Sequence, residues 1–84
     1  MTEFTFSKHA HDQMLLRHIS MDEALGTLQY PDDVIKLEDE QYIYQKIFVS
    51  EDNPKYIIRI FANGNKNPRL IKTLYRTSKI NKYY

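Results

Sequence analysis

The sequence predicts an α+β domain with two N-terminal helices packed on one face of a four-stranded antiparallel meander sheet. Three observations support this fold class. Residues 9–30 have helical composition with two N-cap sites, residues 34–77 switch to alternating apolar and polar positions, and short turn-forming segments separate the alternating runs. The 84 residues suffice for one modest core, so we expect residues 1–84 to form a single domain.

A first helix is expected over residues 9–18, because this run lacks Gly and Pro and follows Ser7, whose side-chain oxygen can cap it. At about 100° per residue, Ala10 and Met14 fall on the side expected to face the core. A neighbouring stripe carries His9, Gln13 and Arg17. The residues before this helix alternate Phe and Thr, which is compatible with a short strand or an apolar arm.

A second helix should begin sharply after Ile19. The segment Ser20-Met-Asp-Glu23 has the pattern of a capping box, in which the Ser20 hydroxyl and the Glu23 carboxylate each accept a backbone N–H of the other. Tyr30-Pro31 should end the helix, since the residue before proline avoids the helical region.

Four strands are expected at about 34–38, 41–50, 55–62 and 69–77, joined by short links that favour antiparallel neighbours. We expect one alternating set on each of the second and third strands to face the helices: Ile43, Ile47 and Val49, then Tyr56, Ile58, Ile60 and Ala62. Alternation leaves the faces of the last strand undecided, because both carry apolar side chains.

Charge is strongly segregated along the chain. Residues 53–84 contain eight Lys or Arg and no acid, whereas residues 1–52 contain four bases and all 11 acids, so the near-neutral net charge of +1 conceals two opposite halves. One interpretation is that acidic helices neutralise a basic sheet internally. We favour an exposed basic surface that binds RNA phosphates or an acidic partner segment, with salt-sensitive affinity.

Composition also argues against several classes of protein. The absence of Cys excludes a disulfide framework and a thiolate metal site, and it suits the cytoplasm, where we expect the protein to act. No apolar run approaches the roughly 20 residues that span a bilayer, and the N-terminus lacks the features of a signal peptide, so no membrane association is expected.

The first third of the chain follows the pattern S-x-H-A-x-x-x-M-x-x-R-x-I-S-x-x-E from Ser7 to Glu23, and the chain closes on Ile71-Lys-Thr-Leu-Tyr-Arg76 before a Lys- and Tyr-rich tail. With these features residues 6–84 resemble small domains of formerly unknown function related to the BrnT and RelE ribonuclease toxins. The resemblance implies a compact α+β unit, RNA cleavage without a metal, and a cognate antitoxin protein that holds the toxin inactive. Catalytic residues vary within this class, so none is transferred by position.

Metal-independent RNA cleavage needs a group that accepts the 2′-hydroxyl proton, a donor for the leaving 5′-oxygen, and positive charge at the phosphate. The candidate catalytic residues are His9, Arg17, Arg59, Tyr75 and Arg76. His9 is the first choice for acid or base, because histidine titrates near neutral pH. The alternatives are that His9 merely hydrogen-bonds a neighbour and that Arg17 forms a salt bridge to Asp12 or Glu23.

The residues expected to contact RNA are Lys46, Arg69, Lys72, Lys79, Lys82 and Tyr44. Tyr75, Tyr83 and Tyr84 lie among or beside these bases and are further candidates for stacking on nucleobases. We expect no metal and no small-molecule cofactor, because His9, His11 and His18 do not share a face at metal-ligand spacing.

A second functional hypothesis is a non-catalytic module of the same fold that binds nucleic acid or an acidic protein. Under it, reversing the charge of Arg69 and Arg76 would abolish binding, whereas His9→Ala would have no effect. A third is that the chain forms part of a larger secreted toxin.

Overall fold

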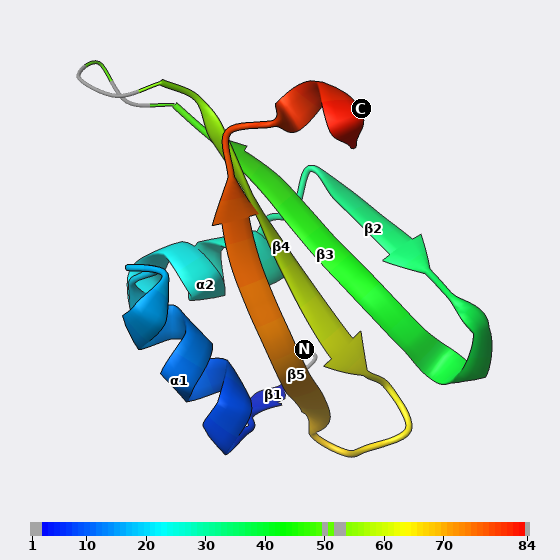
Figure 1. The fold of residues 1–84 in the computed structure, drawn as a ribbon. Coiled ribbons are helices and arrows are strands. Elements are labelled where there is room, and N and C mark those ends of the chain that lie inside the picture. Colours follow the sequence, from blue (N-terminus) through cyan, green and yellow to red (C-terminus); the bar gives the residue numbers. More distant parts are fainter. Residues whose placement is uncertain (1–2, 50, 52–53, 84) are drawn as a thin grey trace.

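Two helices pack on one side of a twisted sheet in the computed structural model, which describes residues 3–49, 51 and 54–83 (Figure 1). The helices are α1 (Lys8–Leu16) and α2 (Met21–Gln29). The strands are β1 (Phe4–Phe6), β2 (Asp33–Lys36), β3 (Gln41–Phe48), β4 (Tyr56–Asn63) and β5 (Arg69–Thr77). Two short 3-10 helices follow β2 and β5: η1 (Glu38–Glu40) and η2 (Ile80–Lys82). No helix in the described ranges is long and apolar enough to cross a membrane.

The sheet has five strands in the order β1-β5-β4-β3-β2, and it is mixed rather than antiparallel. The expected meander is present in β2–β5, but β1 adds a fifth strand, parallel to the start of β5. The prediction of four antiparallel strands is corrected on this point. The pairing of β1 joins Phe4–Phe6 to Arg69–Ile71, which lie near opposite ends of the chain. A short link indicates pairing only between strands that are neighbours in sequence, so the sequence did not predict this pair.

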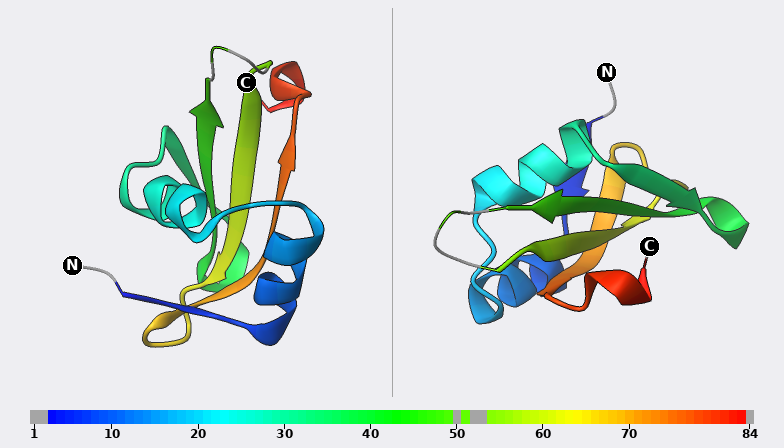
Figure 2. Two further views of the ribbon diagram at one scale, coloured as in Figure 1. Left: turned by 90° about the vertical axis from the view of Figure 1, so that its left-hand side faces the viewer. Right: turned by 90° about the horizontal axis from the view of Figure 1, so that it is seen from above.

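Both helices begin where their caps predict. The Ser7 hydroxyl accepts a hydrogen bond of 3.0 Å from the Ala10 amide, and Ser20 and Glu23 form both halves of the capping box at 3.0 Å each. The helix α1 lies along β5 and α2 lies across β3 and β4, so the two together cover one face of the sheet (Figure 2).

The helix-covered face of β4 is confirmed, since Ile58, Ile60 and Ala62 are fully buried in the core and Tyr56 packs against it. The face predicted for β3 is wrong. Tyr44 joins that core and Tyr42 and Phe48 pack against it, whereas Val49 is 69% exposed. Both alternating sets of β3 are rich in large apolar or aromatic side chains, so the alternation does not distinguish the two faces.

A register shift explains why the faces of β5 could not be assigned. Ala62 of β4 pairs with Ile71, whereas the preceding residue pairs with Thr73, so Lys72 is an extra residue in β5. This bulge lets Ile71 and Leu74 both point into the core despite their spacing of three.

Candidate functional site

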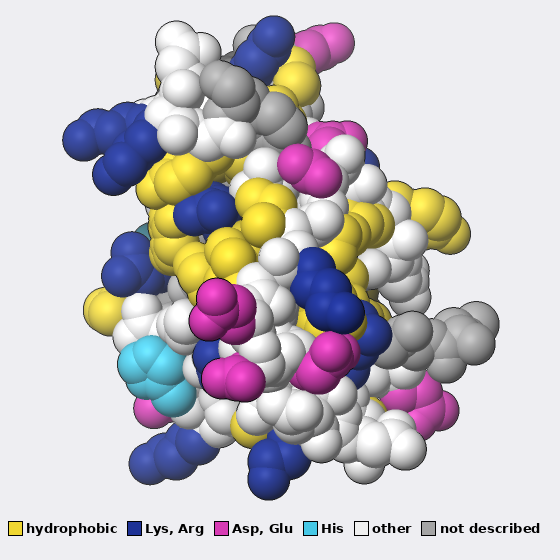
Figure 3. Space-filling view, turned by 90° about the vertical axis from the view of Figure 1, so that its right-hand side faces the viewer, with side chains coloured by type: hydrophobic (Ala, Val, Ile, Leu, Met, Phe, Trp, Pro, Cys, Tyr) yellow, Lys and Arg dark blue, Asp and Glu magenta, His cyan; other side chains and the backbone are white. Residues whose placement is uncertain are grey.

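The face of the sheet away from the helices, here called the second face, carries a three-by-three grid of side chains from β3, β4 and β5. The strand registers define its members: Ile43, Gln45, Ile47, Ile57, Arg59, Phe61, Thr73, Tyr75 and Thr77. Figure 3 looks at this side and shows hydrophobic side chains, drawn in yellow, gathered around a Lys or Arg side chain. An apolar surface with one embedded cation is typical of a binding site rather than of an ordinary solvated face.

The middle row of the grid is polar and directly cross-paired, because Gln45 lies opposite Arg59 and Arg59 lies opposite Tyr75. The Arg59 Nε donates to the Gln45 Oε1 at 2.9 Å, and the Arg59 Nη1 donates to the Tyr75 hydroxyl at 2.8 Å. Three neighbouring strands therefore hold the guanidinium, which gives it little freedom to move.

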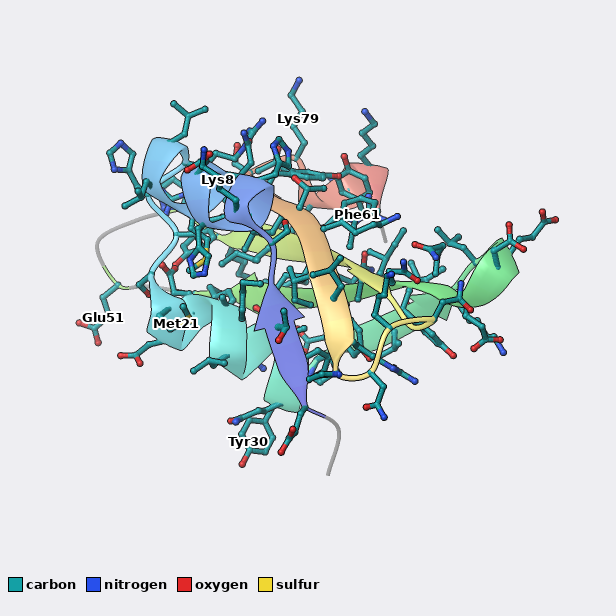
Figure 4. All side chains as sticks on the ribbon, turned by 90° about the horizontal axis from the view of Figure 1, so that it is seen from below. Lys8, Met21, Tyr30, Glu51, Phe61 and Lys79 are labelled. Carbon is teal, nitrogen blue, oxygen red and sulfur yellow. The ribbon has the colours of Figure 1, made fainter. Side chains whose placement is uncertain are left out.

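Aromatic rings enclose the same guanidinium. The chain after β5 returns over the second face through η2, and the Tyr83 ring lies 4.1 Å from the Arg59 Cζ. The Phe61 ring centroid lies 5.7 Å from the same carbon. Figure 4 shows Phe61 beside the C-terminal segment, whereas Lys8 of α1 and Met21 of α2 lie across β5. We call Gln45, Arg59, Phe61, Tyr75 and Tyr83 the Arg59 cluster.

The charge of Arg59 is not neutralised by a carboxylate within the part of the chain that the structure describes. The ion pairs found there join Lys36 to Glu40 at 3.3 Å and Lys46 to Asp32 at 3.9 Å. A guanidinium has five N–H donors, and the bonds to Gln45 and Tyr75 use two of them. Donors thus remain for an anion, and the planar fork suits a phosphate.

The cluster also contains a buried donor without an acceptor. Gln45 is fully buried, and its Nε2 has no hydrogen-bond partner among the described residues. Such a group costs roughly 1–3 kcal/mol, and one in a native fold calls for an explanation. Its Oε1 accepts from Arg59, so this amide helps to position the guanidinium while its own donor stays unpaired.

The tyrosines of the cluster form a chain of hydroxyl groups. Tyr75 accepts from Arg59 and donates to the Tyr83 hydroxyl at 2.9 Å. Burial raises the pKa of Tyr75, and its bond to Tyr83 adds to this, while Arg59 acts in the opposite direction. Tyr75 is therefore neutral at pH 7, which suits a proton donor and not a base. The Tyr83 O–H has no acceptor in the described ranges, so the chain of donors ends there.

The first-choice residue of the sequence, His9, lies outside this cluster. It is exposed on α1, and its side chain forms no hydrogen bond or ion pair with any residue that the structure describes. Arg17, on the same stripe, donates to Gln13 at 2.8 Å and not to Asp12 or Glu23. The structure thus brings Arg59 and Tyr75 together but leaves His9 and Arg17 apart from them.

Two of the bases of β5, Arg69 and Arg76, contact aromatic rings of the helix-covered face. Arg76 lies on the helix side, where its Cζ is 4.7 Å from the Tyr56 ring centroid and Tyr56 donates to Glu23. Burial alone would raise the pKa of Glu23, but hydrogen bonds from the Ser20 amide and the Tyr56 hydroxyl, helped by Arg76, hold it below its usual value. Arg76 therefore has a structural role in this arrangement.

The other residues expected to contact RNA occupy several surfaces. Arg69 stacks 4.2 Å from the Tyr42 ring and donates to Tyr44, which is itself buried on the helix side. Lys46 donates to the Tyr30 carbonyl at 2.9 Å. Lys72 is exposed at the bulge, and Lys79 and Lys82 lie in the C-terminal segment beside the second face. Tyr84 lies outside the described residues.

In the described ranges, the Lys and Arg side chains of the basic half are not neutralised by ion pairs with carboxylates. No Lys or Arg within residues 54–83 forms an ion pair there. Arg76 comes near Glu23 and Arg69 acts weakly on Glu40, but the remaining bases of this half make contacts with aromatic rings or polar groups, or extend into solvent. The segregation of charge in the sequence therefore persists as a surface property.

Two members of the cluster, Gln45 and Phe61, were absent from the residues that the sequence singled out. Strand register would have identified both. Gln45 lies directly opposite Arg59 on β3, and Phe61 follows Arg59 by two residues on β4, so all three share one face. Tyr83 was noted for stacking on bases, but not as the partner of Arg59. No group of three His, Cys, Asp or Glu side chains suited to a metal occurs in the described part of the chain.

Comparison with known proteins identifies a family. The model of a domain of unknown function (DUF4258) matches residues 6–76, which include Gln45, Arg59 and Tyr75 but not Tyr83. No curated protein and no solved structure matches the chain, and nothing in these comparisons links the family to BrnT or RelE. Because the match spans most of the chain, the protein belongs to the DUF4258 family of domains of unknown function.

Proposed function

We propose that the protein is a metal-independent endoribonuclease that binds the scissile phosphodiester of RNA at the Arg59 cluster. The observation that carries the proposal is a guanidinium fixed by Gln45 and Tyr75, with no carboxylate paired to it among the described residues. Negative charge increases on the phosphate as the 2′-oxygen attacks, so a fixed cation stabilises the transition state more than the ground state.

The hydroxyl chain supplies the proton that the leaving 5′-oxygen needs. In the proposal the Tyr83 O–H donates to that oxygen, and Tyr75, whose pKa is raised, stands behind it as the next donor. The rings of Phe61 and Tyr83 provide surfaces on which unpaired bases stack. The cluster itself contains no imidazole or carboxylate, so in the proposal the 2′-proton passes to water.

The proposal extends to the biological setting that the resemblance implies. It places the domain with BrnT- and RelE-related toxins in the cytoplasm, inactive while bound to a cognate antitoxin. Support comes from the α+β fold and from the unpaired basic half of the chain. An acidic segment of the antitoxin would be attracted to the same surface.

The test is single-turnover cleavage of a fluorescent RNA in EDTA, with total RNA and ribosome-bound message as further substrates. Arg59→Gln and Tyr75→Phe should each slow cleavage by roughly 10²-fold or more, as expected for loss of phosphate stabilisation or of a proton donor. Lys66→Gln removes the same charge from an exposed loop and is the matched control. His9→Ala should leave cleavage unchanged, because α1 lies on the other side of the sheet from the cluster. Wild-type protein that leaves every RNA intact would end the proposal.

The alternative is a non-catalytic module that binds nucleic acid or an acidic protein through the same face. One observation favours it: the cluster lacks a group that would accept a proton at neutral pH. Under this alternative, Arg59→Gln weakens binding measured by fluorescence anisotropy, Tyr75→Phe has little effect, and no cleavage occurs after prolonged incubation.

A further inference from the structure

A hollow of about 440 Å³ lies where the C-terminal segment meets the start of β4. Its lining consists of Lys55, Ser78, Lys79, Ile80, Asn81 and Lys82. The hollow is outside the Arg59 cluster, and the chemistry proposed there does not use it. The hollow nevertheless adjoins the cluster, because Lys82, which lines the hollow, directly precedes Tyr83 of the cluster.

Among the described residues, three ammonium groups and no carboxylate line this hollow. None of the three lysines forms an ion pair within the described ranges, although Lys82 comes within 5.8 Å of the Tyr83 ring centroid. Like charges gathered in one concavity repel one another and attract anions from solution. The side chains of Ser78 and Asn81 add hydrogen-bond donors that an anionic oxygen can accept from.

The position of the hollow relates it to the proposed cleavage site. Lys55 is four residues before Arg59 in the same extended segment, so their Cα atoms are separated by about 13 Å. From the other side, Tyr83 stacks on Arg59 immediately after Lys82. An extended polyanion of a few units that has one phosphate at Arg59 would therefore reach the hollow with another.

We infer that this lysine hollow is a second phosphate subsite, which binds the backbone of single-stranded RNA a few nucleotides from the phosphodiester at Arg59. The inference rests on the proposed function for the identity of the ligand. A single strand is favoured over a duplex because the ring of Tyr83, beside the hollow, and the ring of Phe61, on the other side of Arg59, can stack only on bases that are not enclosed in a helix.

Length dependence follows from two separated subsites. A dinucleotide reaches only the Arg59 cluster, whereas an RNA of about 12 nucleotides fills both sites. Each phosphate neutralised on a single strand contributes about 0.7 to the slope of log affinity against log salt. Loss of the hollow should therefore weaken binding of the longer RNA and leave the dinucleotide unchanged.

The test compares a triple variant, Lys55→Gln/Lys79→Gln/Lys82→Gln, with Lys8→Gln/Lys36→Gln/Lys66→Gln, which removes three exposed lysines elsewhere. Fluorescence anisotropy from about 50 to about 200 mM salt measures affinity and slope. We expect the hollow variant to bind the longer RNA roughly 10-fold or more weakly, with a slope lower by up to about 2. Equal affinities for the two triple variants would overturn the subsite.

A second measurement separates this inference from the proposed function. Tripolyphosphate is titrated into ¹⁵N-labelled wild-type protein and the hollow variant, and amide shifts are followed at residues 78–82. Shifts in wild type alone support an anion site there. Their absence in both proteins overturns it, whatever RNA does. Tripolyphosphate binding by a protein that neither binds nor cuts RNA would refute both the RNA assignment and the proposed function, leaving a plain oligophosphate site.

Discussion

Replacing Gln45 and Arg59 together by apolar residues should abolish RNA cleavage and leave the domain as stable as it is now. The single change Arg59→Met leaves the buried Gln45 Oε1 without its 2.9 Å hydrogen bond, on an amide whose Nε2 already has no partner. An orphaned acceptor costs about 1–3 kcal/mol and the lost stacking on Tyr83 about 0.5–1 kcal/mol, so we expect a loss of about 1.5–4 kcal/mol.

Adding Gln45→Leu to that variant removes both unpaired groups from the interior. Replacing both partners of a buried polar contact by apolar groups of similar shape is close to neutral, so the double variant should return to within about 1 kcal/mol of wild type. The two substitutions are thus strongly non-additive, which identifies the pair as a unit that stability alone does not require.

The assay is urea unfolding followed by circular dichroism for wild type, Gln45→Leu, Arg59→Met and the double variant, with cleavage measured on the same samples. In a chain of this size each kcal/mol shifts the melting temperature by about 4–8 °C, so thermal melts give an independent reading. A double variant that stays as unstable as Arg59→Met would show that the pair is structural. A stable double variant that still cleaves RNA would refute the site.

Three further predictions concern single positions. Gly64→Ala should lower the free energy of unfolding by about 1–3 kcal/mol, because a Cβ there meets a ring carbon at 2.7 Å and a backbone oxygen at 2.8 Å. Gly26→Ala, in open space within α2, should raise it by about 1 kcal/mol. Equal melting temperatures for the two variants would contradict both expectations. The pKa of Glu23 is lowered from 4.5, so the stabilisation by its carboxylate is present above that pH and is lost as pH falls through the folded value. On acidification, the melting temperature of Glu23→Gln should therefore fall less than that of Asp22→Asn. The pKa of Tyr75 is raised from 10.0, so the stabilisation by its neutral form is present below pH 10 and is lost as pH rises through the folded value. In Tyr75→Phe the melting temperature should therefore fall less steeply with alkaline pH than in wild type. An unchanged dependence on pH would contradict the assignment.

Much of the secondary structure was predictable because it depends on interactions within a few residues. Ser7 and the Ser20–Glu23 box cap their helices as expected, and β5 spans Arg69–Thr77, the range that alternation predicts. The pairing of β1 and the helix-facing side of β3 were not predictable, since each depends on partners far away in the chain.

The candidate site shows the same division. The sequence identified Arg59 and Tyr75 as separate candidates by residue type, and it favoured His9 because of its titration range. It carried no information on which of them meet. The helix α1 packs along β5 on the other side of the sheet from the Arg59 cluster, so His9 is separate from it.

By itself the sequence determined the cap sites, the turns, the five stretches that become helices and long strands on either side of the α-to-β switch, and the opposite charges of the two halves. These follow from residue type and near-neighbour spacing. Only the tertiary structure decided that Gln45, Arg59 and Tyr75, which are 14 and 16 positions apart, lie in one row beneath Tyr83. The physical reason is that the row is created by the registers of three strands and the return of the C-terminal segment, and neither is encoded within any one of those elements.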